Sequence, residues 1–176
     1  MENIYKRDVR PGNWEDLQHD KRANSLLNLN ENLNFLGLKK QITSDSNILD
    51  IGSGKGAFSE QSMEEGFKNT ISLDINPRSN NKSLNEVKAR IERLPFADET
   101  LDLVHSQMCF DDEVYKQNQK QMMAEIARVL KKGGIYFSSE YYLNSQIAEE
   151  CGLKRMIPKG RYPGYIGVAS IYSKAE

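Results

Sequence analysis

The residues most able to do chemistry in this chain of 176 residues lie in one short stretch, residues 47–56, with the sequence NILDIGSGKG. A short apolar run, interrupted only by Asp50, precedes three glycines at alternate positions: Gly52, Gly54 and Gly56. Such a run is typical of a buried strand in a parallel sheet, and glycines let the chain turn sharply and bring bare backbone close to a ligand. We therefore expect a ligand between the end of this strand and the helix predicted to follow it.

The type of glycine loop narrows the choice of ligand. A phosphate-binding P-loop has Ser or Thr after its lysine, whereas Lys55 precedes a glycine, so no hydroxyl is placed for a magnesium ion. A dinucleotide-binding fold has the pattern G-x-G-x-x-G/A, which Gly52, Gly54 and Ala57 satisfy, and this alternative stays open. Asp50 favours a different ligand, because a carboxylate just before the glycines repels a pyrophosphate and suits an ammonium and a sulfonium group.

A second acidic residue ends the next predicted strand, residues 69–74. Asp74 lies about twenty residues beyond the glycine loop, the spacing at which an acidic side chain meets ribose hydroxyls in βαβ nucleoside sites. A carboxylate can accept hydrogen bonds from both hydroxyls at once. Asp74 therefore predicts a nucleoside ligand without distinguishing NAD from S-adenosylmethionine.

Three sequence blocks carry a family resemblance. The run DIGSGKG resembles the S-adenosylmethionine loop of class I methyltransferases. Residues 92–104, ERLPFADETLDLV, and residues 125–134, EIARVLKKGG, resemble the E-x-L-P-F-x-D-x-x-F-D-x-V and E-x-x-R-V-L-K-P-G-G blocks of the methyltransferase type 11 group. Two positions depart from the pattern. Lys132 stands in place of a proline, and Arg90 stands where the group usually has an aspartate that binds the adenine amino group, a task for which arginine has no acceptor.

The resemblance implies a Rossmann-like α/β fold, with a doubly wound seven-stranded sheet, six strands parallel and the last antiparallel, and helices on both faces. It also implies an enzyme that transfers a methyl group from S-adenosylmethionine. In the implied site, Asp50 binds the methionine amino group directly or through water, Asp74 binds the ribose, and Ile75 and Ile91 contact the adenine. The other implied cofactor residues are Gly52, Ser53 and Gly54, whose backbone approaches the methionine moiety, Gly56, which lets the loop pack, and Ser106, where cofactor meets substrate.

The catalytic residues are less defined by the sequence. The fourth predicted strand, residues 101–104, leads into His105, at the sheet edge that faces the substrate in open α/β folds. His105 is one of only two histidines, and it is either a general base near neutral pH or a residue with a local hydrogen bond. Two histidines and two separated cysteines predict no metal site.

The elements that must position these residues alternate along the chain. Helices are predicted at residues 20–38, 57–65, 113–130 and 144–150, and the remaining strands at 85–91, 135–138, 153–157 and 165–173. We assign residues 1–45 to an N-terminal arm and helix, and residues 46–176 to the S-adenosylmethionine-binding domain. The arm either packs Trp14 on the domain or folds over the ligand, with Tyr5 or Trp14 in the pocket.

The composition predicts the cellular compartment and the binding partners of the protein. A chain with 38% hydrophobic and 28% charged residues is an ordinary soluble globule, and without an apolar leader or a membrane-length run it is expected in the cytoplasm. A net charge of −1 gives no nucleic-acid footprint, so a small-molecule acceptor is favoured over RNA or protein. No lid is inserted, so the arm, a large substrate, or a partner subunit or dimer closes the site. A non-catalytic binding protein and an NAD-dependent reductase remain as alternatives.

Overall fold

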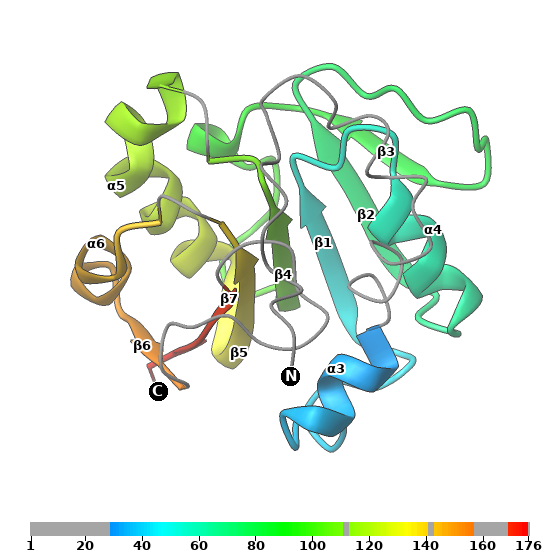
Figure 1. Ribbon diagram of the computed structural model, residues 1–176, viewed down its shortest axis with the longest axis horizontal. Helices are drawn as coiled ribbons and strands as arrows, with labels where there is room; N and C mark the ends of the chain where they lie inside the picture. The colour runs from blue at the N-terminus through cyan, green and yellow to red at the C-terminus, as the bar shows by residue number, and fades with distance from the viewer. Residues whose placement is uncertain (1–28, 111–112, 141–142, 157–168, 176) are drawn as a thin grey trace, which may run out of the picture.

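The computed structural model describes residues 29–110, 113–140, 143–156 and 169–175 (Figure 1). Within them, seven strands form one sheet in the order β3-β2-β1-β4-β5-β7-β6. The strands are β1 (Asn47–Ile51), β2 (Asn69–Asp74), β3 (Asn85–Lys88), β4 (Leu101–Gln107), β5 (Leu130–Ser139), β6 (Leu153–Arg155) and β7 (Ala169–Lys174). The helices are α3 (Leu29–Phe35), α4 (Ala57–Glu64), α5 (Glu113–Val129) and α6 (Ser145–Glu150), with a short 3-10 helix, η1 (Ile91–Arg93).

The strand directions confirm the predicted topology. β1 pairs in parallel with β2 and β4, β2 with β3, and β4 with β5, whereas β7 runs antiparallel to both β5 and β6. Six strands therefore point one way and β7 the other. The chain winds outward from β1 in both directions, so a crevice is expected at the carboxyl ends of β1 and β4, where the strand order reverses.

Helices cover both faces of the sheet, with α4 and α5 on opposite sides (Figure 1). Side chains alternate along β1, because successive residues of a strand point to opposite faces. Ile48 packs in a core with residues of α3 and α4, whereas Leu49 and Ile51 pack in a core with residues of α5 and α6. Burying a side chain of this size stabilises the fold by about 1.5–3 kcal/mol. Asp50 shares the face of Ile48, so its carboxylate enters the α4 side of the sheet.

The first described helix ends as its sequence predicts. The helix predicted over residues 20–38 overlaps α3, and its first nine residues lie outside the described part of the chain. Gly37 adopts a left-handed conformation with φ of 69°. The Leu38 amide then donates to the Leu33 carbonyl at 2.8 Å, closing the helix in the manner that favours glycine after the last turn.

The start of β5 differs from the prediction. The predicted helix over residues 113–130 and the predicted strand over residues 135–138 leave residues 131–134 between them, but β5 already begins at Leu130. Leu130 pairs with Leu101, and the next pair joins Ile135 to Leu103, so β5 carries extra residues between these two pairs. A β-carbon at Gly134 would lie 2.8 Å from the Lys131 carbonyl oxygen. Glycine therefore permits a β-bulge that the sequence pattern alone reads as a helix end.

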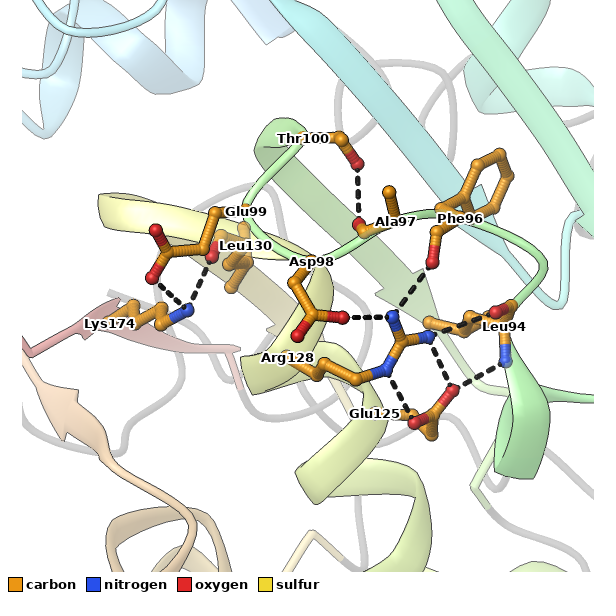
Figure 2. Close-up of polar contacts among 10 residues, drawn as sticks. All are labelled: Leu94, Phe96, Ala97, Asp98, Glu99, Thr100, Glu125, Arg128, Leu130 and Lys174. Carbon is orange, nitrogen blue, oxygen red and sulfur yellow. Dashed lines mark hydrogen bonds and ion pairs between the residues drawn. The ribbon is translucent and has the colours of Figure 1, made fainter.

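Arg128 joins two sequence blocks that are far apart in the chain (Figure 2). Its guanidinium donates to the Phe96 carbonyl at 2.8 Å, the Asp98 carboxylate at 2.7 Å and the Leu94 carbonyl at 3.0 Å. It also forms a two-pronged pair with Glu125, both bonds 2.8 Å long. The segment that enters β4 is thereby fixed on α5, and this places the carboxyl end of β4 relative to β1.

Candidate functional site

The glycine loop, residues 52–56, lies at the carboxyl end of β1, as predicted. Gly52, Gly54 and Gly56 all have positive φ, at 67°, 55° and 84°, a region that residues with side chains seldom adopt. A β-carbon at Gly52 would lie 2.3 Å from the Cys109 β-carbon, and one at Gly56 would lie 2.5 Å from the Leu84 Cδ1. The glycines thus provide the backbone conformation of the loop and room for two neighbouring segments to pack against it.

The amides of this loop bind protein acceptors. The Ser53 amide donates to the Leu73 carbonyl at 3.1 Å, and the Gly56 amide to the Ser53 carbonyl at 2.8 Å. The Gly54 amide donates to the Asp74 Oδ2 at 2.9 Å. In a phosphate-binding loop such amides point at the phosphate oxygens, so this loop lacks three of the donors that a pyrophosphate would need. In the same loop, the Ser53 hydroxyl is buried and has no hydrogen-bond partner within the described residues.

Asp74 ends β2 beside the glycine loop. Its Oδ2 accepts from the Gly54 amide and its Oδ1 from the Asn76 amide at 2.7 Å, while the side chain remains half-buried. A carboxylate has about four lone-pair positions, so two remain for a ligand. Ile75 follows directly and is 43% exposed, which leaves an apolar side chain at the surface next to the carboxylate.

Asp50 lies beneath the loop and is paired with His105. The Asp50 Oδ1 is 2.9 Å from the His105 Nδ1, and its Oδ2 accepts from the Ser59 hydroxyl at 3.0 Å. The imidazole stacks on Phe58, with ring centres 3.6 Å apart. Both side chains are almost fully buried, Asp50 at 3% and His105 at 2% exposure. The structure thus brings together the two acid–base groups that the sequence singled out, but in the interior on the α4 side.

This placement bears on both predicted roles. The binding of an ammonium group by Asp50 stays a prediction, because both carboxylate oxygens already have partners in the protein. Proton transfer by His105 also stays a prediction, since the ring is enclosed between β4 and Phe58. In this structure, the Asp50–His105 pair connects β1, β4 and α4 below the loop.

Two other predicted cofactor residues are buried on the α5 side. The Ser106 hydroxyl bonds with the Tyr136 hydroxyl at 2.9 Å and has no exposed surface. Burial raises the pKa of Tyr136 well above its ordinary value, and the nearby Glu140 adds to this. Ile91 is 4% exposed and belongs to the core packed on α5. Contact of Ser106 and Ile91 with a cofactor stays a prediction.

Glu140 is a residue at this edge of the sheet that the sequence reasoning missed. It follows β5 directly and is fully buried. Its carboxylate accepts from the amides of Cys109 and Phe110, at 3.2 and 3.1 Å, and from the Cys109 thiol at 3.4 Å. Glu140 thereby fixes the segment after β4, in which Met108 has an unusual positive φ of 56°. The available signal was an acid two residues after the strand predicted over residues 135–138.

Several predicted features lie outside the described residues. They are the N-terminal arm with Tyr5 and Trp14, and residues 165–168 of the strand predicted over residues 165–173, the rest of which lies in β7. Among the residues that the structure does describe, no helix is long and apolar enough to cross a membrane. In the same ranges, no group of three or more His, Cys, Asp or Glu residues is arranged to bind a metal ion.

Comparison with known proteins agrees with this architecture. A family model described as a methyltransferase domain matches residues 49–138, slightly more than half of the chain. The matched region runs from β1 into β5, so it contains the glycine loop, Asp74 and the segment held by Arg128. The family resemblance predicted from the sequence blocks is thereby confirmed.

Individual relatives are more distant. The sarcosine/dimethylglycine N-methyltransferase of Halorhodospira halochloris is 25% identical over 115 residues, which cover 58% of this chain and 40% of that protein. The chain spans less than half the length of the curated relatives that it matches.

Solved structures show the same fold at low identity. The Burkholderia thailandensis 1,6-didemethyltoxoflavin-N1-methyltransferase, solved with 1,6-didemethyltoxoflavin and S-adenosylhomocysteine, is 14% identical, with a TM-score of 0.69 over 92% of this chain and 82% of that one. A methyltransferase of Haloferax volcanii, solved with the Trm112 methyltransferase activator, is 16% identical, with a TM-score of 0.64 over 93% of this chain and 95% of that one. At such identities the likeness extends to the fold, and it confirms the predicted architecture.

Proposed function

The chain belongs to the methyltransferase domain family, and from this premise we propose that it transfers a methyl group from S-adenosylmethionine to an acceptor. When bound, S-adenosylmethionine supplies a methyl group on a sulfonium centre, which is already a good leaving group. The chain's own residues then have to bind and orient two molecules, and such positioning accounts for much of the acceleration in reactions of this kind.

The loop amides are the observation that carries this proposal. The amides of Ser53, Gly54 and Gly56 bind protein acceptors, so the loop is poorly suited to the pyrophosphate of a dinucleotide. Two carboxylates, those of Asp50 and Asp74, lie under and beside the same loop. A negative environment of this kind favours a ligand with positive charge. S-adenosylmethionine carries an ammonium and a sulfonium group and has no phosphate.

The residues at the loop fit the parts of this cofactor. We assign the ribose hydroxyls to Asp74, which retains free lone pairs, and one edge of the adenine to the exposed Ile75. The Ser53 hydroxyl is buried and has no partner among the described residues, which supports a polar contact with the amino-acid part of the cofactor, next to the backbone of Gly52 and Gly54. The charge of Asp50 acts on the ammonium group from beneath the loop, through space or through a water molecule.

We favour a small-molecule acceptor. A net charge of −1 provides no electrostatic attraction for nucleic acid, and two of the similar proteins are named for small-molecule acceptors. A methyltransferase of similar fold was solved with the Trm112 activator, so a partner subunit that completes the acceptor site is the second arrangement to test. We place the enzyme in the cytoplasm.

Ligand titration tests the proposal directly. Calorimetry of the full chain with S-adenosylhomocysteine is expected to give saturable binding, whereas NADH is expected to give none. Binding of NADH alone would show the protein to be a nicotinamide-linked enzyme instead. If S-adenosylhomocysteine binds, release of S-adenosylhomocysteine from S-adenosylmethionine in the presence of small amines, phenols or RNA identifies the acceptor class. Binding without turnover of any acceptor would favour a non-catalytic role.

A further inference from the structure

One carboxylate near the proposed cofactor site has a buried oxygen atom without a partner among the described residues. Glu92 lies in η1, and its side chain is 10% exposed. Its Oε1 accepts a hydrogen bond from the Arg90 guanidinium at 2.8 Å, whereas its Oε2 is buried and has no hydrogen-bond partner in the described part of the chain. Leaving a buried acceptor unpaired is costly. The Oε2 atom therefore points to a donor that these residues do not supply.

The sheet register places Glu92 next to the nucleoside end of the site. Lys88, the last residue of β3, lies opposite Asp74, and the Ala89 amide donates to the Asp74 carbonyl at 3.1 Å. The chain continues through Arg90 in an extended conformation into η1. Glu92 is thus three residues beyond the hydrogen bond that ties this segment to Asp74, and it lies at the same edge of the sheet as the exposed Ile75.

We propose that Glu92 recognises the adenine ring, with its Oε2 accepting a hydrogen bond from the exocyclic amine. This inference rests on the proposed function, because it requires an adenosine-type ligand. An ionised carboxylate is purely an acceptor and a guanidinium is purely a donor. Of the two side chains in this ion pair, only Glu92 can therefore bind an amino group. A purine with an oxygen at this position would face carboxylate oxygen instead and would be rejected.

Arg90 pairs with the other oxygen of this carboxylate. Its guanidinium donates to Oε1, so Oε2 is the oxygen left for a ligand. The Arg90 side chain is 54% exposed, and an exposed ion pair of this kind contributes little to stability. Loss of this ion pair is therefore expected to leave the Glu92 carboxylate in place.

Two ligands that differ at one atom test the proposal. S-adenosylhomocysteine carries the amine, and S-inosylhomocysteine carries a carbonyl oxygen in its place. We expect the full-length protein to prefer S-adenosylhomocysteine by roughly 10- to 100-fold, the range for a hydrogen bond to a charged acceptor. In Glu92→Gln the side-chain amide can donate to the carbonyl or accept from the amine, so the preference is expected to fall to about threefold or less.

Two control variants test whether the ligand preference depends on Glu92 itself or on other charged residues. Arg90→Ala removes the neighbouring donor and is expected to keep the preference. Glu64→Gln removes a carboxylate at the far end of α4 and is also expected to keep it. An unchanged preference in Glu92→Gln, or loss of the preference in Arg90→Ala alone, overturns the proposal.

Measurements on the wild-type protein alone also test the proposal, whether or not the Glu92 variant folds. Equal affinity for the two ligands overturns the role of Glu92 while leaving the proposed function intact. Binding of neither ligand contradicts the proposed function itself, and the recognition of adenine with it.

Discussion

Asp74 has contacts within the protein and, in the proposed function, also binds the ligand. Each of its oxygens accepts one backbone amide, from Gly54 and from Asn76. These bonds orient the carboxylate, while two of its lone-pair positions remain for a ligand. In the proposed function, this one residue therefore links the conformation of the glycine loop to the binding of the nucleoside.

Replacing Asp74 by alanine is expected to weaken the binding of S-adenosylhomocysteine by about 1.5–3 kcal/mol, because two ribose hydroxyls lose a charged acceptor. Calorimetric titration measures the change. Asp45→Ala is a matched control, since Asp45 is an exposed residue before the amino end of β1. Unchanged affinity in Asp74→Ala would mean that the ribose contact is assigned to the wrong residue.

Substitutions at Gly52 and Gly66 distinguish the effect of backbone strain from that of steric crowding. Both have positive φ, at 67° and 95°. A β-carbon at Gly66 meets nothing within 4 Å, whereas one at Gly52 lies 2.3 Å from the Cys109 β-carbon. Gly66→Ala is therefore expected to cost about 1 kcal/mol of folding free energy and to leave ligand affinity unchanged.

Gly52→Ala is expected to displace the loop or the segment after β4, and so to lower the affinity for S-adenosylhomocysteine at least tenfold, about 1.4 kcal/mol. Chemical unfolding and calorimetry on the same samples measure both quantities. Equal ligand affinity in the two variants would show that the packing of Cys109 on Gly52 has no part in binding.

At the scale of elements, the pair of Glu125 and Arg128 fixes the segment before β4 on helix α5. The hydrogen bond from Arg128 lowers the pKa of Glu125 despite the opposing effect of burial, and the bond from the Leu94 amide adds to the shift. A carboxyl group whose pKa is lower in the folded than in the unfolded state stabilises the fold above its unfolded pKa. This contribution is lost as the pH falls from about 4.5, the ordinary value, through the lower folded one.

Glu125→Gln is accordingly expected to lower the free energy of unfolding by about 1–2 kcal/mol at pH 7, because it removes the charge that Arg128 faces. The difference from the wild type should shrink below pH 4 or so, where the wild-type residue is also protonated. Urea unfolding at a series of pH values measures this. A difference that is independent of pH would assign the effect to shape and not to charge.

A second contact between elements, made by Glu140, connects the end of β5 to the segment after β4. Glu140→Ala would leave the buried amides of Cys109 and Phe110 without their acceptor, at a cost of about 1–3 kcal/mol. Release of this segment is expected to speed alkylation of the Cys109 thiol, measured by mass spectrometry. Cys151, which is hydrogen-bonded to the Lys120 carbonyl instead, serves as the internal reference and should keep its rate. Equal acceleration at both thiols would indicate general unfolding.

At the scale of the whole molecule, the strand order decides which residues can act together. Asp50, Asp74 and Glu140 come from β1, β2 and the end of β5, which are far apart in the chain. Because these strands are parallel, all three residues lie toward the same end of the sheet. The strand order thus brings together three acidic residues that are distant in the chain, although the net charge of the chain is only −1.

The sequence by itself determined the fold and the position of the site. Short apolar runs predicted buried strands, glycines at alternate positions predicted the turn after β1, and the family resemblance predicted a doubly wound seven-stranded sheet with its last strand antiparallel. These features are local, since a strand or a tight turn depends on residues that are close in the chain. For the same reason Asp74, at the end of its own strand, was found from spacing alone.

Only the tertiary structure decided which partner each polar side chain has. Asp50 bonds to His105 across 55 residues of chain, and Arg128 reaches Asp98 across 30. Alternation along a strand tells which face a side chain occupies, but the neighbour that it meets depends on strand register and helix packing. The buried pairing of Asp50, the role of Glu140 and the Glu92 oxygen that has no partner among the described residues are therefore properties of the folded chain.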